Sequence, residues 1–302
     1  MLDELRVDTV CREARCPNKG ECYSAGTASF LILGDACTRG CRFCSVDRDG
    51  ARVSTISRIG VADRPLPGAP SADEPRRVAE AAARLRLRHA VITSVTRDDL
   101  PDGGAAQFAA TIEAVRLSTP GATVEVLIPD LSGDRMALHT VLAARPDVLA
   151  HNLETVPRLY SRVRPQAEYR RSLELLARAV AWARGTAVPP DGEARAPRRP
   201  QIKSGLMLGL GEDSAEVHQI MIDCVATGVD VLTIGQYMQP RRDCLPVARY
   251  VTPEEFSTLE GLGETLGILV RAAPFVRSSY RAGELLSAAS RPTTARPSAT
   301  GE

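Results

Sequence analysis

Short apolar segments alternate with helical segments along most of this chain, and that alternation limits the folds open to it. Six segments are typical of buried parallel strands, because they are apolar throughout rather than at every second residue. Between them lie alanine- and leucine-rich stretches with helical spacing. The strand segments are residues 28–34, 89–95, 123–129, 147–152, 202–211 and 229–236, and the helical ones include 74–87, 105–118, 168–184 and 213–227.

Strand alternating with helix predicts an α/β fold, either a partial (β/α)6-type TIM barrel or a doubly wound open sheet. Polar residues follow the strand ends, as in TSVTRDD (93–99) and HNLET (151–155). The barrel is favoured because barrel active sites are built on the loops after the strands. Residues 47–73 and 185–200 are rich in Pro, Gly and Arg, and we expect surface loops there and a disordered tail at 289–302.

Whole-chain composition excludes several classes of protein. The chain has 302 residues, 44% of them hydrophobic, and a formal net charge of +1. No apolar run approaches the roughly 18 to 20 residues that span a bilayer, and no secretory signal opens the chain. The charge predicts no nucleic-acid partner. We therefore expect a cytoplasmic protein without membrane attachment, and nothing in the sequence requires more than a monomer.

Cysteines are concentrated near the start of the chain. Six of the eight fall between residues 11 and 44. Thiols stay reduced in the cytosol, so metal ligation is favoured over disulfides. The N-terminal triplet has the spacing C-x4-C-x5-C, and the loop triplet, which directly follows the first predicted strand, has C-x3-C-x2-C. These are Cys11, Cys16 and Cys22, and then Cys37, Cys41 and Cys44.

Three thiolates on one tight loop suit three irons of a four-iron, four-sulfur cluster. Gly40 lets that loop curl, and the fourth iron is left open, as in metal sites that carry out chemistry. Zinc is the alternative, but zinc ribbons reach four ligands from paired knuckles, whereas each triplet here supplies three cysteines and no neighbouring histidine. An iron–sulfur centre is therefore favoured over zinc.

The loop triplet, with Phe43 before its last cysteine, is similar to the signature of radical S-adenosylmethionine enzymes. The N-terminal triplet, VCREARCPNKGEC, resembles the auxiliary-cluster motif of the lipoyl synthase family. Further segments resemble that family in its order, covering most of residues 8–285. They are VITSVTRDDLPDGGA (91–105), HNLETVPRLYSRVRP (151–165), KSGLMLGLGE (203–212), TIGQYMQP (233–240), LPVARYVTPEEF (245–256) and VRSSYRAGE (276–284).

The resemblance implies a radical enzyme that binds two 4Fe-4S clusters and S-adenosyl-L-methionine. In the family, a 5′-deoxyadenosyl radical removes hydrogen from C6 and C8 of a carrier-bound octanoyl chain, and the auxiliary cluster donates two sulfurs. The implied partners are an octanoylated lipoyl carrier domain or a glycine-cleavage carrier protein, and an electron donor such as ferredoxin or flavodoxin. A serine of the R-S-S-Y motif completes the auxiliary ligands, and by position that serine is Ser278.

Strand-end polar residues are the candidates for holding the cofactor, with helix capping or loop bridging as the alternative for each. They are Thr93, Ser94, Asn152 and Glu154. Lys203 and Arg249 are expected to form salt bridges. Cys224 is expected to be a buried apolar residue, Cys244 a free surface or loop thiol, and His151 is the one histidine placed to face the site.

We expect four segments: an auxiliary-cluster segment at 1–27, the barrel at 28–270, a serine segment at 271–288 and the tail at 289–302. Relatives carry several tens of residues before the first triplet, and the stretches 47–66 and 185–200 look inserted. These departures leave open a divergent enzyme that inserts sulfur into another acyl chain. Two further hypotheses are an electron-transfer or structural iron–sulfur protein and a zinc-dependent binding module.

Overall fold

The computed structural model describes residues 1–14, 16–46, 68–186 and 199–284. Most of the two predicted surface loops, at 47–67 and 187–198, lies outside the described residues. So does the predicted tail at 289–302.

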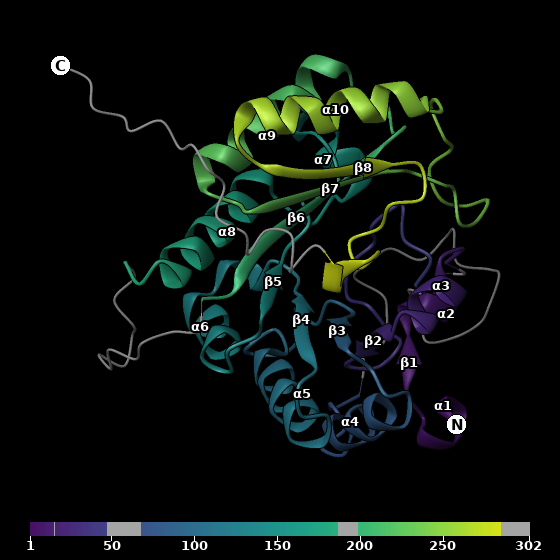
Figure 1. The fold of residues 1–302 in the computed structure, drawn as a ribbon, viewed down its shortest axis with the longest axis vertical. Helices are drawn as coiled ribbons and strands as arrows, with labels where there is room; N and C mark the ends of the chain where they lie inside the picture. The colour runs from purple at the N-terminus through teal and green to yellow at the C-terminus, as the bar shows by residue number, and fades with distance from the viewer. Residues whose placement is uncertain (15, 47–67, 187–198, 285–302) are drawn as a thin grey trace.

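One curved sheet of eight strands organises the described residues, and its strand order follows the chain from β1 to β8 (Figure 1). All neighbouring strands from β2 to β8 are parallel, and only β1 is antiparallel to β2. The expected partial barrel is thus confirmed, and the six predicted strands correspond to β2–β7. The strands are β1 (Asp8–Thr9), β2 (Thr27–Ile32), β3 (His89–Ser94), β4 (Thr123–Leu127), β5 (Val148–Ala150), β6 (Gln201–Leu208), β7 (Val231–Gln236) and β8 (Leu269–Ala273).

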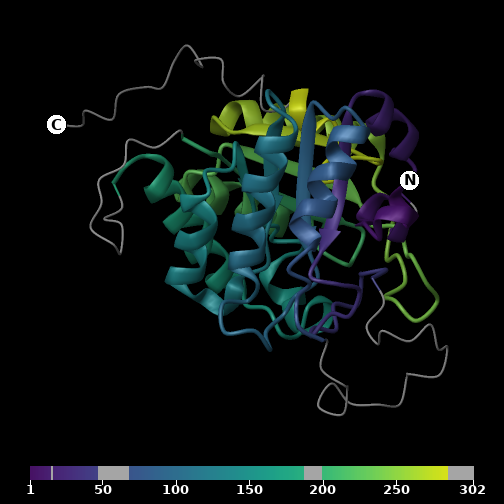
Figure 2. The same cartoon turned by 90° about the horizontal axis from the view of Figure 1, so that it is seen from below.

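The larger helices cover the outer face of this sheet, and three short ones lie at its β1 edge (Figures 1 and 2). The predicted helices correspond to α4, α5, α8 and α9, and α5 has the predicted bounds. Capping boxes begin α9 at Asp213 and α10 at Thr252. The helices are α1 (Leu2–Leu5), α2 (Val10–Glu13), α3 (Lys19–Ser24), α4 (Glu74–Arg84), α5 (Ala105–Ser118), α6 (Arg135–Ala143), α7 (Tyr160–Val163), α8 (Tyr169–Ala183), α9 (Ser214–Thr227) and α10 (Pro253–Leu266), with 3-10 turns at Leu131–Gly133 and Pro157–Leu159.

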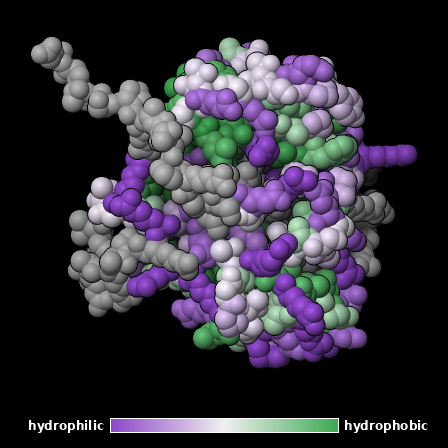
Figure 3. All heavy atoms as spheres, viewed as in Figure 1, coloured by the Kyte–Doolittle hydropathy of each residue, from purple (hydrophilic) through white to green (hydrophobic). Residues whose placement is uncertain are grey.

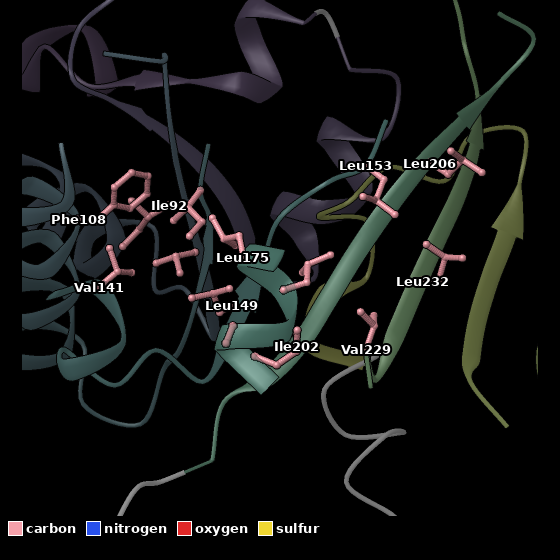
Figure 4. Packing of buried hydrophobic residues seen from close by; sticks show 14 of the residues in the cluster. Ile92, Phe108, Val141, Leu149, Leu153, Leu175, Ile202, Leu206, Val229 and Leu232 are labelled. Carbon is pink, nitrogen blue, oxygen red and sulfur yellow. The ribbon is translucent and has the colours of Figure 1, made fainter. Parts of the chain in front are cut away.

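The apolar core lies between the sheet and its helices. Phe108 of α5, Ile92 of β3 and Val141 of α6 are fully buried and point toward one another (Figure 4). Cys224 of α9 is also fully buried, which confirms its expected apolar role. Burial of this area supplies most of the driving force for the fold.

Inside the barrel, a buried ion pair connects two strands. Lys203 Nζ of β6 lies 2.8 Å from Glu125 Oε1 of β4, and both side chains are 1% exposed. His89 Nε2 lies 3.3 Å from the second oxygen of the same carboxylate. The salt bridges expected for Lys203 and for Arg249, whose partner is Glu255 at 2.8 Å, are both present.

The two ends of the described chain meet at the β1 edge. Asn18 Nδ2 donates to the carbonyl of Phe275 at 2.7 Å, and Arg281 forms an ion pair with Glu21 at 2.7 Å. Strand β8 runs to Ala273 and therefore crosses the boundary expected at residue 270. Every helix in the described ranges falls short of the length and apolar character that crossing a bilayer requires.

Candidate iron–sulfur and cofactor site

The loop triplet follows β2, and backbone bonds fix it against three other segments. Thr38 N donates to the carbonyl of Thr96, beyond β3, at 3.0 Å. Arg42 N donates to the carbonyl of Val163 at 2.8 Å, and the Arg42 carbonyl accepts from Leu245 N at 2.9 Å. The loop is therefore held at the carboxyl end of the barrel, where the sequence predicted an active site.

Two thiols of this triplet have defined surroundings. Cys37 Sγ accepts hydrogen bonds from Thr96 N at 3.3 Å and from Arg39 N at 3.5 Å. Burial raises the pKa of Cys41 to about 11, against the opposing charge of Arg164. Without a metal the Cys41 thiol is therefore protonated near neutral pH, and a bound iron would displace that proton.

The N-terminal triplet lines a small cavity beside β2. Cys11 comes from α2, Cys22 from α3, and Cys16 from the turn between them. Burial raises the pKa values of Cys16 and Cys22, and no carboxylate of the described residues lines the cavity with them. The cavity is lined by Cys11, Cys16, Cys22, Asn18, Lys19, Thr27, Ser29, Arg277, Ser279 and Tyr280.

The two serines of the R-S-S-Y segment have different surroundings. Ser279 lines the cavity of the N-terminal triplet. Ser278 Oγ instead accepts a hydrogen bond of 2.6 Å from Asn152 Nδ2, at the end of β5. The segment thus connects the N-terminal triplet to the strand-end residues, and the ligand role of Ser278 stays a prediction.

Glu154 and Asn152 lie together beyond β5. Asn152 Nδ2 donates to Glu154 Oε1 at 3.0 Å. Glu154 has a left-handed backbone with φ of +66°, which is uncommon outside glycine and recurs at functional sites. Its backbone is paired with β6, through bonds of 2.9 Å from Glu154 N to the Gly205 carbonyl and from Met207 N to the Glu154 carbonyl. Burial raises the pKa of its carboxyl, although Arg164 acts in the opposite direction.

Several polar atoms near these strand ends are buried without a hydrogen-bond partner among the described residues. They include Ser94 Oγ at the end of β3 and Asn152 Oδ1 beyond β5. Thr93 differs, because its hydroxyl donates to the Leu127 carbonyl at 2.8 Å. Buried polar atoms normally find a partner, so a polar ligand is the natural complement to this group.

Sequence reasoning missed Arg164, a cation that is 7% exposed beside Asn152 and Glu154. Its Nη1 donates to the Asn152 carbonyl at 2.8 Å, and its guanidinium carbon lies 5.2 Å from the ring centre of Tyr160. Arg164 Nε is buried and has no hydrogen-bond partner within the described ranges. The available signal was its place in YSRVRP, within a segment that resembles the lipoyl synthase family.

Two expectations need correction. Cys244 is a free thiol in a loop, as expected, but it does not lie at the surface. It is 4% exposed, with Sγ 3.5 Å from the carbonyl of Cys44, because its loop packs against the loop triplet. His151 does not face the site, since Nδ1 lies 2.9 Å from the Ile128 carbonyl and Nε2 lies 2.9 Å from Ser172 Oγ. Both nitrogens are therefore occupied within the core.

The donor sets fit the groups that the sequence predicted. Each triplet presents three soft thiol ligands, which is the ligand type that iron–sulfur clusters need. Between the triplets lie a buried guanidinium, a carboxyl and unpartnered amide and hydroxyl atoms, which suit an amino acid's carboxylate and ammonium groups. In the described part of the chain, no three His, Cys, Asp or Glu side chains are grouped as a single metal ion would need.

Comparison with known proteins agrees with the family resemblance seen in the sequence. Residues 31–222 match the family model of the Radical SAM superfamily. The chain is 52% identical to the lipoyl synthase of Nitratidesulfovibrio vulgaris over 93% of its own length and 84% of that protein. It is 53% identical to the lipoyl synthase of Oleidesulfovibrio alaskensis over 93% of its length and 86% of that protein, and 50% identical to that of Thermus thermophilus over 93% and 79%.

Solved structures share the fold at low identity. The hydrogenase maturase HydG of Carboxydothermus hydrogenoformans superposes with a TM-score of 0.59 at 14% identity, covering 86% of this chain and 56% of that one. Methylornithine synthase gives a TM-score of 0.51 at 12% identity, covering 89% and 74%. The fold is therefore that of radical SAM enzymes, and the relatives at about half identity along nearly the whole chain make the assignment narrower: the chain belongs to the lipoyl synthase family of the Radical SAM superfamily.

Proposed function

We propose that this chain inserts two sulfur atoms, at C6 and C8, into an octanoyl chain that is amide-linked to a lysine of a carrier protein. The observation that carries the proposal is the presence of both triplets, one beside β2 and one at the carboxyl end of the barrel. Family membership favours this enzyme over the electron-transfer protein, the zinc module and the enzyme for another acyl chain.

The loop triplet is proposed to hold one 4Fe-4S cluster through Cys37, Cys41 and Cys44. The N-terminal triplet is proposed to hold the auxiliary cluster, with a serine of the R-S-S-Y segment as the fourth ligand. When bound, these clusters and S-adenosyl-L-methionine supply a primary carbon radical and the sulfide that is inserted. The serine oxygen is a harder ligand than thiolate, so that corner is expected to be the most labile.

The chain's own residues are proposed to orient the cofactor. Arg164, fixed by the Asn152 carbonyl, places a buried positive charge beside the site, which suits a carboxylate. Glu154 and the unpartnered Asn152 oxygen suit an ammonium group. Ser94 is proposed to bond a sugar hydroxyl, and Thr93, whose hydroxyl already bonds a backbone carbonyl, is proposed as a lining residue.

The same proposal includes the partners and the location. The substrate would be an octanoylated lipoyl carrier domain or the glycine-cleavage carrier protein, and the electrons would come from a ferredoxin or flavodoxin. A cytoplasmic location suits six thiols that must stay reduced.

The direct test is mass spectrometry of an octanoyl-lysine carrier peptide, incubated without oxygen with the reconstituted protein, S-adenosyl-L-methionine and dithionite. We expect the peptide to gain two sulfurs with no net loss of hydrogen, as the dithiol, and to lose two hydrogens only after that dithiol is oxidised in air to the disulfide. Cys41→Ala should abolish cofactor cleavage and sulfur insertion together, whereas Cys16→Ala should abolish sulfur insertion and leave 5′-deoxyadenosine formation. A wild-type protein that forms 5′-deoxyadenosine but adds no sulfur to the peptide would contradict the proposed substrate.

A further inference from the structure

Arg39 lies inside the loop triplet, between Cys37 and Cys41, and its side chain is 5% exposed. Its Nε and Nη2 donate to the two carboxylate oxygens of Asp98, each at 2.8 Å. The same Nη2 donates to Asp130 Oδ1 at 2.6 Å. One buried guanidinium thus binds two carboxylates at once.

The two carboxylates come from loops that follow neighbouring strands, Asp98 after β3 and Asp130 after β4. Asp98 is also bound to Thr38, whose Oγ1 donates to Asp98 Oδ2 at 3.2 Å. Asp130 is fully buried and accepts from Ser132 N at 3.1 Å. Arg39 therefore ties the cysteine loop to two strand ends through side chains that are themselves fixed.

The buried carboxylate of Asp130 depends on the positive charge of Arg39. Burial alone would raise the pKa of Asp130, but the hydrogen bond and charge of Arg39 lower that pKa to about 2. The next guanidinium, that of Arg171, lies 3.4 Å from the other oxygen of Asp130 and is 26% exposed. Without Arg39, this fully buried carboxylate would keep the amide of Ser132, and its remaining cationic partner in the described chain would be the more distant and more hydrated Arg171.

The backbone amide of Arg39 also bonds the sulfur of Cys37, one of the proposed cluster ligands. Arg39 N and Thr96 N both donate to Cys37 Sγ, and Thr38 N donates to the Thr96 carbonyl. A displacement of the Arg39 side chain would therefore move the amides that face this sulfur. Backbone amides directed at a cluster sulfur influence cluster stability and potential.

We propose that Arg39 is a positioning residue for the radical cluster: bound to Asp98 and Asp130, it fixes the loop that presents Cys37 and Cys41. This rests on the proposed function only in that the loop triplet binds a cluster. A lysine at this position would keep the positive charge. It lacks the planar guanidinium group that bonds both oxygens of Asp98 and one oxygen of Asp130 at the same time.

The test compares Arg39→Gln, Arg39→Lys and the matched control Arg171→Gln after anaerobic reconstitution of the full chain. Iron and sulfide are counted, and electron paramagnetic resonance of the dithionite-reduced protein is recorded with and without S-adenosyl-L-methionine. We expect Arg39→Gln to lose about half of the roughly eight irons of two clusters, and to lose the spectral change that the cofactor induces. Arg39→Lys should keep more iron but show an altered spectrum, and Arg171→Gln should match wild type.

Full iron content and an unchanged spectrum in Arg39→Gln would overturn the proposal, as would an equal loss in Arg171→Gln. Should circular dichroism show that Arg39→Gln does not fold, Asp98→Asn replaces it and is judged by the same readouts. Asp98 is 34% exposed, and asparagine has the shape of aspartate without its charge. None of these readouts uses the acyl substrate. A wild-type protein that fails on octanoyl peptide would therefore count against the proposed function alone.

Discussion

At the strand ends, single residues are buried with polar atoms that no neighbour within the described ranges satisfies. Ser94, Asn152 and Arg164 all have such atoms. Leaving a buried polar group unpaired costs roughly 1–3 kcal/mol, so this group of residues is costly to the unliganded fold. The sequence predicted Ser94 and Asn152 because both lie at the ends of predicted strands. It did not single out Arg164, since an arginine in a polar loop segment is usually exposed.

The two neighbouring serines give a prediction at this scale. Ser279 lines the cavity of the N-terminal triplet, while the hydroxyl of Ser278 is bonded to Asn152. We expect Ser279→Ala to lower the iron content of the auxiliary cluster more than Ser278→Ala, because the Ser279 side chain already faces that cavity. Iron and sulfide analysis of both variants in a Cys41→Ala chain, which lacks the radical cluster, checks this. A larger loss in Ser278→Ala would instead establish the ligand that the family resemblance implies.

His151 predicts a pH dependence of stability. Burial, aided by the charge of Arg164, lowers its pKa from 6.5 to about 4. Below pH 6.5 the unfolded chain therefore takes up a proton that the folded chain refuses, so stability is present above that pH and falls as the pH drops. The loss should reach about 3 kcal/mol by the folded pKa.

The measurement is urea unfolding of anaerobically prepared protein between pH 7 and pH 4. His151→Gln should flatten the pH dependence of the unfolding free energy, because glutamine does not titrate. The exposed His218 offers the control, and His218→Gln should leave the slope as in wild type. An unchanged slope in His151→Gln would show that other groups cause the acid loss.

At the scale of elements, continuous apolar runs made β2 to β7 predictable. Strand β8 was not predicted because buried and exposed residues alternate along it, with Arg271 exposed between buried Val270 and Ala272. Helix α10 was not predicted because Gly261 and Gly263 weaken its helical pattern. Burial on both faces leaves a clear signal in sequence, whereas burial on one face of a short element does not.

A glycine of β7 gives the prediction for this scale. A Cβ at Gly235 would lie 2.1 Å from the carbonyl oxygen of Val276, so Gly235→Ala must displace the segment that carries Ser278 and Ser279. We expect this variant to lose auxiliary-cluster iron and keep the radical cluster, because the atoms nearest to that Cβ in the described chain belong to Val276 and Arg277 rather than to the loop triplet.

Gly261→Ala is the matched control for that experiment. A Cβ at Gly261 of α10 meets no heavy atom of the described residues within 4 Å, and alanine stabilises a helix interior by about 0.8–1 kcal/mol over glycine. The control should keep full iron content and unfold at a slightly higher temperature. Equal iron in Gly235→Ala and wild type would mean that the segment is free to move without affecting the cluster.

At the scale of the whole molecule, the site is made by joining the two ends of the described chain. Asn18 bonds the Phe275 carbonyl, and Tyr280 and Arg281 contact Glu21. The two partners in each of these contacts are more than 250 residues apart in sequence. Hydrophobic periodicity predicts elements but no such long-range pairing, so only the family resemblance linked the R-S-S-Y segment to the N-terminal triplet. Figure 3 shows hydrophobic groups lying among hydrophilic residues on one face of the molecule.

A pair of truncations tests this closure. A chain ending at Phe275 keeps β8 but loses the segment that lines the N-terminal triplet's cavity, so we expect about half the iron of two clusters and no sulfur insertion. Formation of 5′-deoxyadenosine should persist, because the loop triplet is held by the loops after β3, β5 and β7. A chain ending at Glu284 keeps every contact described above and should retain both clusters and activity. If the shorter chain still held two clusters, the auxiliary ligands would have to come from the N-terminal segment alone, and the joining of the two ends would serve another step than cluster binding.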